Sequence, residues 1–219
     1  ELSYFYNRVA QTTREYFIDI YPVKGLIISG PGPTKEDFIN GNYLEYRLQN
    51  NIINTIDASY SGAEGIREAF AKSGDILGSF RLVEEKKMIE DLFREINTNT
   101  GKGSYGLQEV IEYLKNNVVK MLLITDNTNL HRVEAECKRC KHVQEDIVER
   151  PMVIPKKTEY KNNPCPECKA MDTEVNEQDI VDYLEIIAAK TGSQLEVISG
   201  SAEHGNMLAS LGKVGAILR

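Results

Sequence analysis

The stretch LQEVIEYLKNNVVKMLLIT, from Leu107 to Thr125, decides the fold class of this 219-residue chain. Its first part, residues 107–116, predicts a helix. Its second part, residues 118–125, is apolar almost throughout, which is typical of a strand that is covered on both faces of a sheet. We therefore expect a helix that leads into a central strand.

The same alternation continues toward the C-terminus. The predicted elements there are a helix at 177–190, a strand at 195–199, a helix at 203–211 and a strand at 215–218. Upstream, apolar residues at helical spacing predict a helix over 83–97, followed by a loop with two glycines at 98–105. Strands that alternate with helices in this way predict a layered α/β domain.

The first third of the chain carries a second, shorter α/β pattern. The predicted elements are a helix at 1–20, a strand at 25–29, short helices from 34 and over 43–50, and a weak strand at 51–58. A break follows at 59–65, after which Ile66, Phe70, Ile76 and Leu77 fall on one face of a helical region. We therefore predict a partial α/β domain over 1–61 and a larger domain over 62–219.

All four cysteines of the chain occur in two C-x2-C pairs, separated by twenty-four residues: Cys137, Cys140, Cys165 and Cys168. Each pair lets one tight turn present two sulfurs, and two such turns complete the tetrahedron that zinc prefers. Because sulfur fills all four positions, the predicted zinc ion is structural, with a hairpin expected between the two turns. The alternatives are one disulfide within each pair or four idle thiols, while His142 is a less favoured substitute ligand.

No other stretch predicts chemistry. Gly30–Lys35 follows a strand and precedes a helix, but its prolines lack the N–H donors of a phosphate loop, so it predicts a rigid turn. His131, His142 and His204 have no recognisable mutual spacing, and neither G-x-S-x-G nor H-E-x-x-H occurs. We therefore expect no catalytic residue and no enzyme activity.

Composition limits the remaining classes of protein to which the chain could belong. The net charge of -7 excludes a basic footprint over the whole chain, so Lys86–Lys87 and the basic residues of 138–141 predict solvated surface. No run of eighteen apolar residues occurs, and the N-terminus lacks a signal-peptide pattern, so no membrane segment is expected. Four cysteines in two pairs favour an intracellular, cytoplasmic protein over a secreted disulfide scaffold.

Several motifs spread over the chain carry a family resemblance. They are Gly25–Phe38, Asp57–Gly65, Glu84–Lys87, Thr100–Lys102, Tyr105–Gly106 and Gly212–Arg219. Together they resemble the archaeal and eukaryotic class I peptide chain release factors, subunit 1, over nearly all of the chain. The cysteine pairs fall where archaeal members of that family carry a small zinc subdomain, here about 131–175.

The resemblance implies a role in translation termination. Residues 1–61 are similar to the later part of the family's middle domain. Residues 62–219 are similar to its C-terminal α/β/α domain, which resembles kink-turn-binding ribosomal proteins and binds a translational GTPase on the ribosome. No Gly-Gly-Gln motif occurs, so we expect a fragment that begins after that loop and neither reads stop codons nor triggers peptidyl-tRNA hydrolysis.

Two other readings stay open, and one property follows from the expected truncation. A Pelota-like ribosome rescue factor also lacks Gly-Gly-Gln, although the zinc pairs and the Gly-Pro-Gly-Pro turn favour a release factor. An independent RNA-binding zinc protein is disfavoured by the net charge.

Because the strand at 25–29 would lack sheet partners, we also predict self-association through residues 1–61.

Overall fold

The structure is a computed structural model that describes residues 2–98 and 100–219. Glu1, in the first predicted helix, and Asn99, in the predicted loop at 98–105, lie outside the described residues. The chain forms two compact units: unit 1 ends at Val83, and unit 2 runs from Glu84 to Arg219. The sequence placed the division near residue 61, but helix α4 (Gly62–Lys72) packs against the strands of unit 1.

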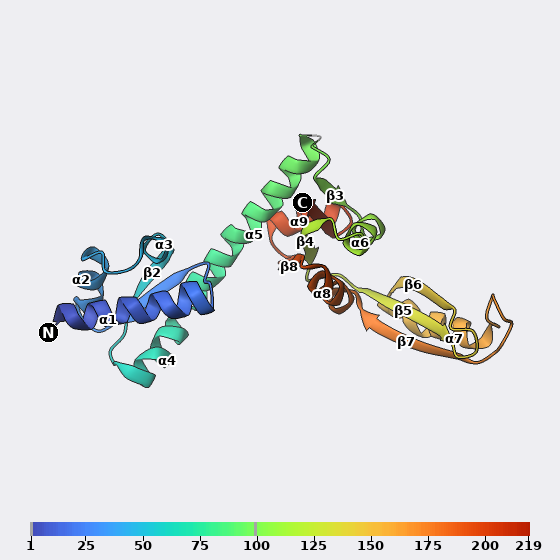
Figure 1. The fold of residues 1–219 in the computed structure, drawn as a ribbon, viewed down its shortest axis with the longest axis horizontal. Coiled ribbons are helices and arrows are strands. Elements are labelled where there is room, and N and C mark those ends of the chain that lie inside the picture. The colour runs from blue at the N-terminus through green and yellow to red at the C-terminus, as the bar shows by residue number, and fades with distance from the viewer. Residues whose placement is uncertain (1, 99) are drawn as a thin grey trace. The chain divides into compact units, whose positions relative to one another are not determined.

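Unit 1 is built around a two-stranded parallel sheet (Figure 1). Its elements are α1 (Leu2–Arg14), the π-helical turn η1 (Glu15–Ile20), β1 (Leu26–Gly30), α2 (Thr34–Asn40), α3 (Tyr46–Gln49), β2 (Ile52–Asp57) and α4. The predicted helix and both predicted strands of this region are confirmed. Tyr6 of α1 anchors the core, because its ring lies 5.5 Å from Phe38 and 5.0 Å from Tyr43.

The apolar face predicted after the break is helical but largely exposed. Ile66 and Phe70 of α4 are 70% and 77% exposed, and a new helix, α5 (Gly74–Asn97), begins just after Ser73. Helical spacing therefore predicted the helices correctly, but it does not identify a buried face here.

Unit 2 is centred on a four-stranded sheet with the order β3-β9-β4-β8. Its elements are the later part of α5, β3 (Gly103–Tyr105), α6 (Leu107–Lys115), β4 (Val119–Thr125), β5 (Leu130–Cys137), β6 (Val143–Glu149), a 3-10 turn (Arg150–Met152), α7 (Val153–Asn162), β7 (Thr173–Asp179), α8 (Ile180–Thr191), β8 (Gln194–Ile198), α9 (Glu203–Ser210) and β9 (Val214–Leu218). Strand β4 is internal, antiparallel to β9 and parallel to β8, as its apolar sequence predicted.

The side chains of β4 alternate between two cores. Leu122 and Ile124 pack with α6 and α8, whereas Leu123 packs with α5 and α9. This arrangement confirms the predicted α/β/α layering. The helix predicted at 177–190 begins later, at Ile180, because Asp179 caps its N-terminus and accepts the N–H of Val181 at 2.8 Å.

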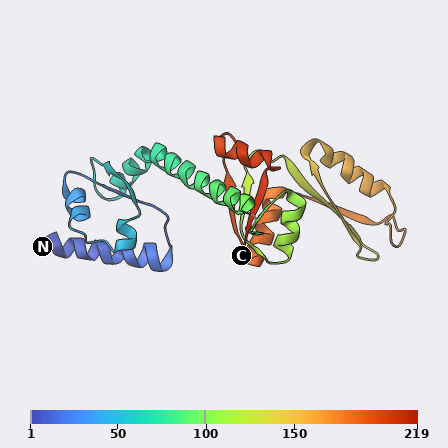
Figure 2. The same cartoon turned by 90° about the horizontal axis from the view of Figure 1, so that it is seen from above.

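An antiparallel sheet of order β6-β5-β7 is inserted between β4 and α8. In Figures 1 and 2, α7 lies along this sheet, in agreement with its contacts to β5 and β7. The prediction of a hairpin between the cysteine turns is wrong, because β6 and α7 fill that spacer. Strand β6 pairs with β5, upstream of the spacer, and so no second strand is needed within it. No helix in the described part of the chain is long and apolar enough to cross a membrane.

Candidate metal centre

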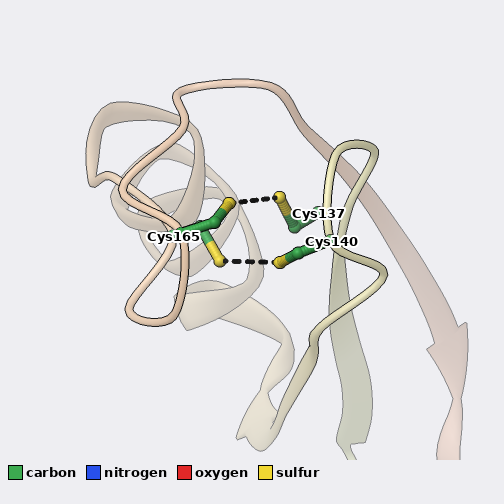
Figure 3. A group of neighbouring side chains, drawn as sticks. Cys137, Cys140 and Cys165 are labelled. Atoms are coloured by element: carbon green, nitrogen blue, oxygen red, sulfur yellow. Dashed lines mark hydrogen bonds between the residues drawn. The ribbon is translucent and has the colours of Figure 1, made fainter.

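The two cysteine pairs sit in two turns at one end of the inserted sheet. The first turn, Cys137–His142, joins β5 to β6, and the second, Cys165–Ala170, lies between α7 and β7. Both turns place lysine directly after the second cysteine. Elements that are distant in sequence thus bring two similar turns face to face (Figure 3).

The two turns have the same backbone hydrogen bonds. The N–H of the first cysteine donates to the sixth residue of its turn, at 2.9 Å from Cys137 to His142 and at 2.8 Å from Cys165 to Ala170. The lysine N–H donates a hydrogen bond to the carbonyl of the first cysteine, at 2.8 Å from Lys141 and at 2.9 Å from Lys169. The backbones of the two turns are therefore two copies of one design.

Lys141 and Lys169 both adopt left-handed backbone conformations, with φ of 63° and 60°. For a residue other than glycine, such a conformation is unfavourable by about 1 kcal/mol. Two equivalent left-handed lysines indicate that the surrounding turn determines the backbone and that the cysteine positions are set with it.

The four sulfurs form one compact group. All four Sγ atoms lie within 4.8 Å of one another, with 3.5 Å between Cys137 and Cys168 and 3.6 Å between Cys140 and Cys165. A disulfide would require about 2.05 Å, and all four thiols are free. A tetrahedral ion with metal–sulfur bonds of about 2.3 Å separates its sulfurs by about 3.8 Å, so the group fits a metal ion.

Hydrogen bonds and burial shift the pKa values of the two cysteines in the first turn in opposite directions. The backbone N–H of Cys140 donates to the Cys137 sulfur and lowers the pKa of Cys137 to about 7. The backbone N–H of His142 lowers the pKa of Cys140, but burial and the other three sulfurs outweigh it and raise that pKa to about 12. A divalent cation would be needed to hold four thiolates together.

The surroundings contribute charge but no further ligand. Lys141 pairs with Glu136 at 2.9 Å, and Lys138 lies 3.8 Å from Glu174. The His142 ring is not part of the sulfur group, and this histidine takes part in the turn through its backbone. Four sulfurs leave no open position for a substrate, so the group can hold an ion structurally rather than catalytically.

The positively charged side chain of the rigid turn at Gly30–Lys35 is already paired within unit 1. The Lys35 ammonium is buried and lies 2.5 Å from Asp57, 3.0 Å from Glu36 and 2.8 Å from the carbonyl of Gly32. Because three oxygens already surround this ammonium group, the turn does not offer a free cation to a phosphate.

One buried charged contact escaped the sequence analysis. Glu85 of α5 is 4% exposed and accepts the Ser199 N–H at 2.9 Å, and the Nε2 of His204 lies 3.0 Å from the same carboxylate. Glu85 stands four residues before the buried Ile89, so the helical period could have placed it on the inner face. His131, by contrast, lies at the start of β5 and approaches Asp179 only at 4.0 Å.

Comparisons with known proteins agree on one family. The model of eRF1 domain 2 matches residues 1–79, and the model of eRF1 domain 3 matches residues 82–219. Peptide chain release factor subunit 1 of Thermococcus onnurineus is 34% identical over 224 residues, covering 100% of this chain and 53% of that protein. The Methanocaldococcus jannaschii protein of the same name is 31% identical over 220 residues, covering 98% of this chain and 52% of its own length. This chain thus spans about half the length of these relatives.

Solved structures share the fold. The C-terminal domain of the peptide chain release factor from Methanosarcina mazei has a TM-score of 0.61 at 26% identity, covering 74% of this chain and 97% of that one. An archaeal chain in a model of ribosome-bound Pelota and ABCE1 has a TM-score of 0.60 at 22% identity, covering 99% and 49%, which shows a shared fold alone. With both domain models matched in order along its length, this chain belongs to the eRF1 family, among relatives named peptide chain release factor subunit 1.

Proposed function

We propose that this chain works in translation termination as part of a peptide chain release factor. The observation that carries the proposal is the match of eRF1 domains 2 and 3, in that order, over residues 1–79 and 82–219. The names of the relatives favour a release factor over the Pelota-like rescue factor, whose structures share the fold.

Within that function, unit 2 is proposed to bind a translational GTPase beside the ribosome, in the cytoplasm. The match of the eRF1 domain 3 model to residues 82–219 supports this assignment. The release-factor names of the relatives support a ribosomal setting.

The four cysteines are proposed to hold one zinc ion. Matched turns, four free sulfurs at tetrahedral spacing and a closed donor set all support this choice, because zinc favours four sulfur ligands in structural sites. The ion would clamp the turn after β5 to the turn before β7, and it would take no part in any reaction.

A binding experiment tests the termination function. The chain is titrated with a purified elongation-factor-type GTPase of the termination pathway, with the corresponding rescue GTPase and with a kink-turn RNA at moderate salt. Selective binding of the termination GTPase is the expected result. Selective binding of the rescue GTPase would favour the Pelota-like function, and tight RNA binding without GTPase binding would favour the independent RNA-binding protein.

The predicted self-association through residues 1–61 is separate from termination. It depends only on surface that unit 1 leaves uncovered, and it would persist in a chain that binds no GTPase.

A further inference from the structure

The two close sulfur contacts of the metal centre each join one cysteine turn to the other (Figure 3). The Sγ of Cys137 lies 3.5 Å from that of Cys168, and the Sγ of Cys140 lies 3.6 Å from that of Cys165. In each contact, the first cysteine of one turn meets the second cysteine of the other turn. The sulfur group therefore consists of two cross-turn pairs with the same arrangement.

Burial follows the same division. The first cysteines, Cys137 and Cys165, are buried, whereas Cys140 is exposed and Cys168 is partly exposed. Within the described residues, each cross-turn pair thus joins a buried sulfur to a more accessible one. A small oxidant that reaches the accessible sulfur finds a second thiol beside it, in the facing turn.

Backbone pairing holds the two turns together independently of any ion. Cys137, the last residue of β5, pairs with Thr173, the first residue of β7. The N–H of Lys138 also donates to the carbonyl of Asp172 at 2.9 Å, which continues the ladder into the first turn. The loss of an ion therefore leaves this link between the turns in place.

The positions of the sulfurs favour disulfides across the turns. Because a disulfide has an S–S distance of about 2.05 Å, each cross-turn pair has to close by roughly 1.5 Å. The partners are 31 and 25 positions apart in sequence, whereas the cysteines of one C-x2-C pair are only three apart. A disulfide that closes the longer loop restricts the unfolded chain more, and so it stabilises the folded chain more.

We propose that the metal centre is an oxidation-sensitive site whose cysteines form two cross-turn disulfides, Cys137–Cys168 and Cys140–Cys165. The oxidant is hydrogen peroxide. The accessible sulfur attacks one peroxide oxygen, the O–O bond breaks, and a sulfenic acid and one water form. The buried partner then attacks that sulfur, the S–S bond forms, and the hydroxyl group leaves as a second water. Each pair of thiols loses two electrons and two protons, and one peroxide molecule accepts them.

Oxidation would exchange one link between the turns for another. A disulfide no longer supplies the thiolates that a metal ion requires, so a bound ion is released. The new bonds join the turn after β5 to the turn before β7, which are the turns that the ion would join. The insertion therefore keeps its fold while it loses its ion. The release of the ion rests on the proposed zinc site, whereas the pairing rests on the sulfur contacts alone and is independent of termination.

Peptide mapping of the 219-residue chain tests the pairing. The zinc-loaded chain and a chelator-treated chain are oxidised with hydrogen peroxide, alkylated and digested with trypsin without reduction. Trypsin cleaves at the basic residues between Cys137 and Cys140 but leaves Cys165 and Cys168 in one peptide. The expected product joins all three cysteine peptides. Fragmentation between Cys165 and Pro166 should leave Cys140 attached to Cys165, and Cys137 attached to Cys168.

Two further measurements test the consequence of oxidation. Two equivalents of peroxide should release one equivalent of zinc to a chromophoric chelator. Amides of β5 and β7 should exchange at least about tenfold more slowly in the oxidised chain than in the reduced, zinc-free chain, because the disulfides hold the turns together.

Two double variants provide the matched comparison, since each keeps one cysteine in each turn. Cys137→Ser with Cys168→Ser keeps the contact between Cys140 and Cys165. Cys137→Ser with Cys165→Ser keeps Cys140 and Cys168, which do not form one of the two contacts. The first variant should form its disulfide at least tenfold faster than the second.

Several results would overturn the proposal. They are disulfides within each C-x2-C pair, cross-turn disulfides in the other register, sulfinic acids in place of disulfides, and equal rates in the two double variants. Fast exchange of β5 and β7 after oxidation would overturn the exchange of one link for the other. Both expected disulfides in a chain that never held zinc would support the pairing and contradict the proposed zinc ion, so the two proposals fail separately.

Discussion

Replacing Glu85 by alanine removes the acceptor of one buried and one partly buried contact in unit 2. The Ser199 N–H, at 2.9 Å, and the His204 ring, at 3.0 Å, would both lose their partner. A donor left without an acceptor costs about 1–3 kcal/mol, and Glu85→Ala leaves two such groups, the Ser199 N–H and the His204 ring. We therefore expect Glu85→Ala to lower the free energy of unfolding of unit 2 by about 3 kcal/mol.

Native-state hydrogen exchange of the β4 amides measures this loss within unit 2, because β4 is the internal strand of its sheet. A loss of 3 kcal/mol corresponds to exchange that is faster by about 100-fold, at 1.36 kcal/mol per tenfold change. Glu85→Gln keeps one carbonyl acceptor and should lose less. Glu90→Ala, on the exposed side of the same helix, should change the free energy of unfolding by less than about 0.5 kcal/mol.

A loss below about 1 kcal/mol for Glu85→Ala, or one no larger than that of Glu90→Ala, would contradict this expectation. Either result would mean that the carboxylate contributes little beyond what solvent supplies, and that the contact between α5, the β8–α9 turn and α9 is not a strong stabilising link.

Three further predictions concern the metal turns, acid sensitivity and a close backbone approach. Cys165→Ser should reduce bound zinc, measured by atomic emission, from one equivalent to less than half, whereas His142→Ala should keep it. Burial raises the pKa of Asp146, but the hydrogen bonds from Lys156 and Tyr160 outweigh burial and lower this pKa below its usual value. The stabilisation by the charged carboxylate is therefore present at neutral pH and should be lost as the pH falls below about 4. Hydrogen exchange of the β6 amides at graded pH would detect this loss. Gly205→Ala would place a Cβ 2.0 Å from a backbone carbonyl oxygen, and we expect a loss of at least about 2 kcal/mol in urea unfolding.

Each of these predictions has a clear contrary result. Zinc retained by Cys165→Ser would contradict the four-sulfur site, and zinc lost from His142→Ala would return that histidine to the ligand set. Asp146→Asn with an unchanged acid profile would contradict the proposed origin of that sensitivity. Gly78→Ala meets no atom within 4 Å in a helix interior and should stabilise by up to about 1 kcal/mol, so equal effects at Gly78 and Gly205 would contradict the steric argument.

Local patterns predicted the parts of the fold that they determine by themselves. The continuous apolar run of β4 identified an internal strand, and the spacing of the cysteines identified four residues that the structure brings within 4.8 Å. Strand β7 was missed because TEVNEQD is polar along most of its length. Its pairing with β5, far upstream in sequence, defines it as a strand, and a local pattern does not contain that information.

The same limit explains the exposed face of α4. Ile66 and Phe70 have helical spacing, but burial also requires a partner surface, and in unit 1 these side chains border an open groove. Glu85 shows the converse case, since a carboxylate on the inner face of α5 is buried where groups of the distant β8–α9 region reach it. Amphipathic spacing therefore predicts which residues share a face, whereas tertiary contacts decide whether that face is buried.

The inserted sheet has little apolar material with which to stabilise the end that carries the cysteines. The buried side chains of the whole insertion, which includes α7 and both cysteine turns, include Val133, Ala135 and Val153, together with Cys137 and Cys165 themselves. Two of these five buried side chains are therefore potential metal ligands, and a small unit with so few aliphatic contacts needs another source of stability. Metal binding to a site that exists only in the folded state contributes directly to folding. The cysteine spacing is then best understood as part of the stability of the insertion, because the proposed ion would take the place of a hydrophobic core between the two turns.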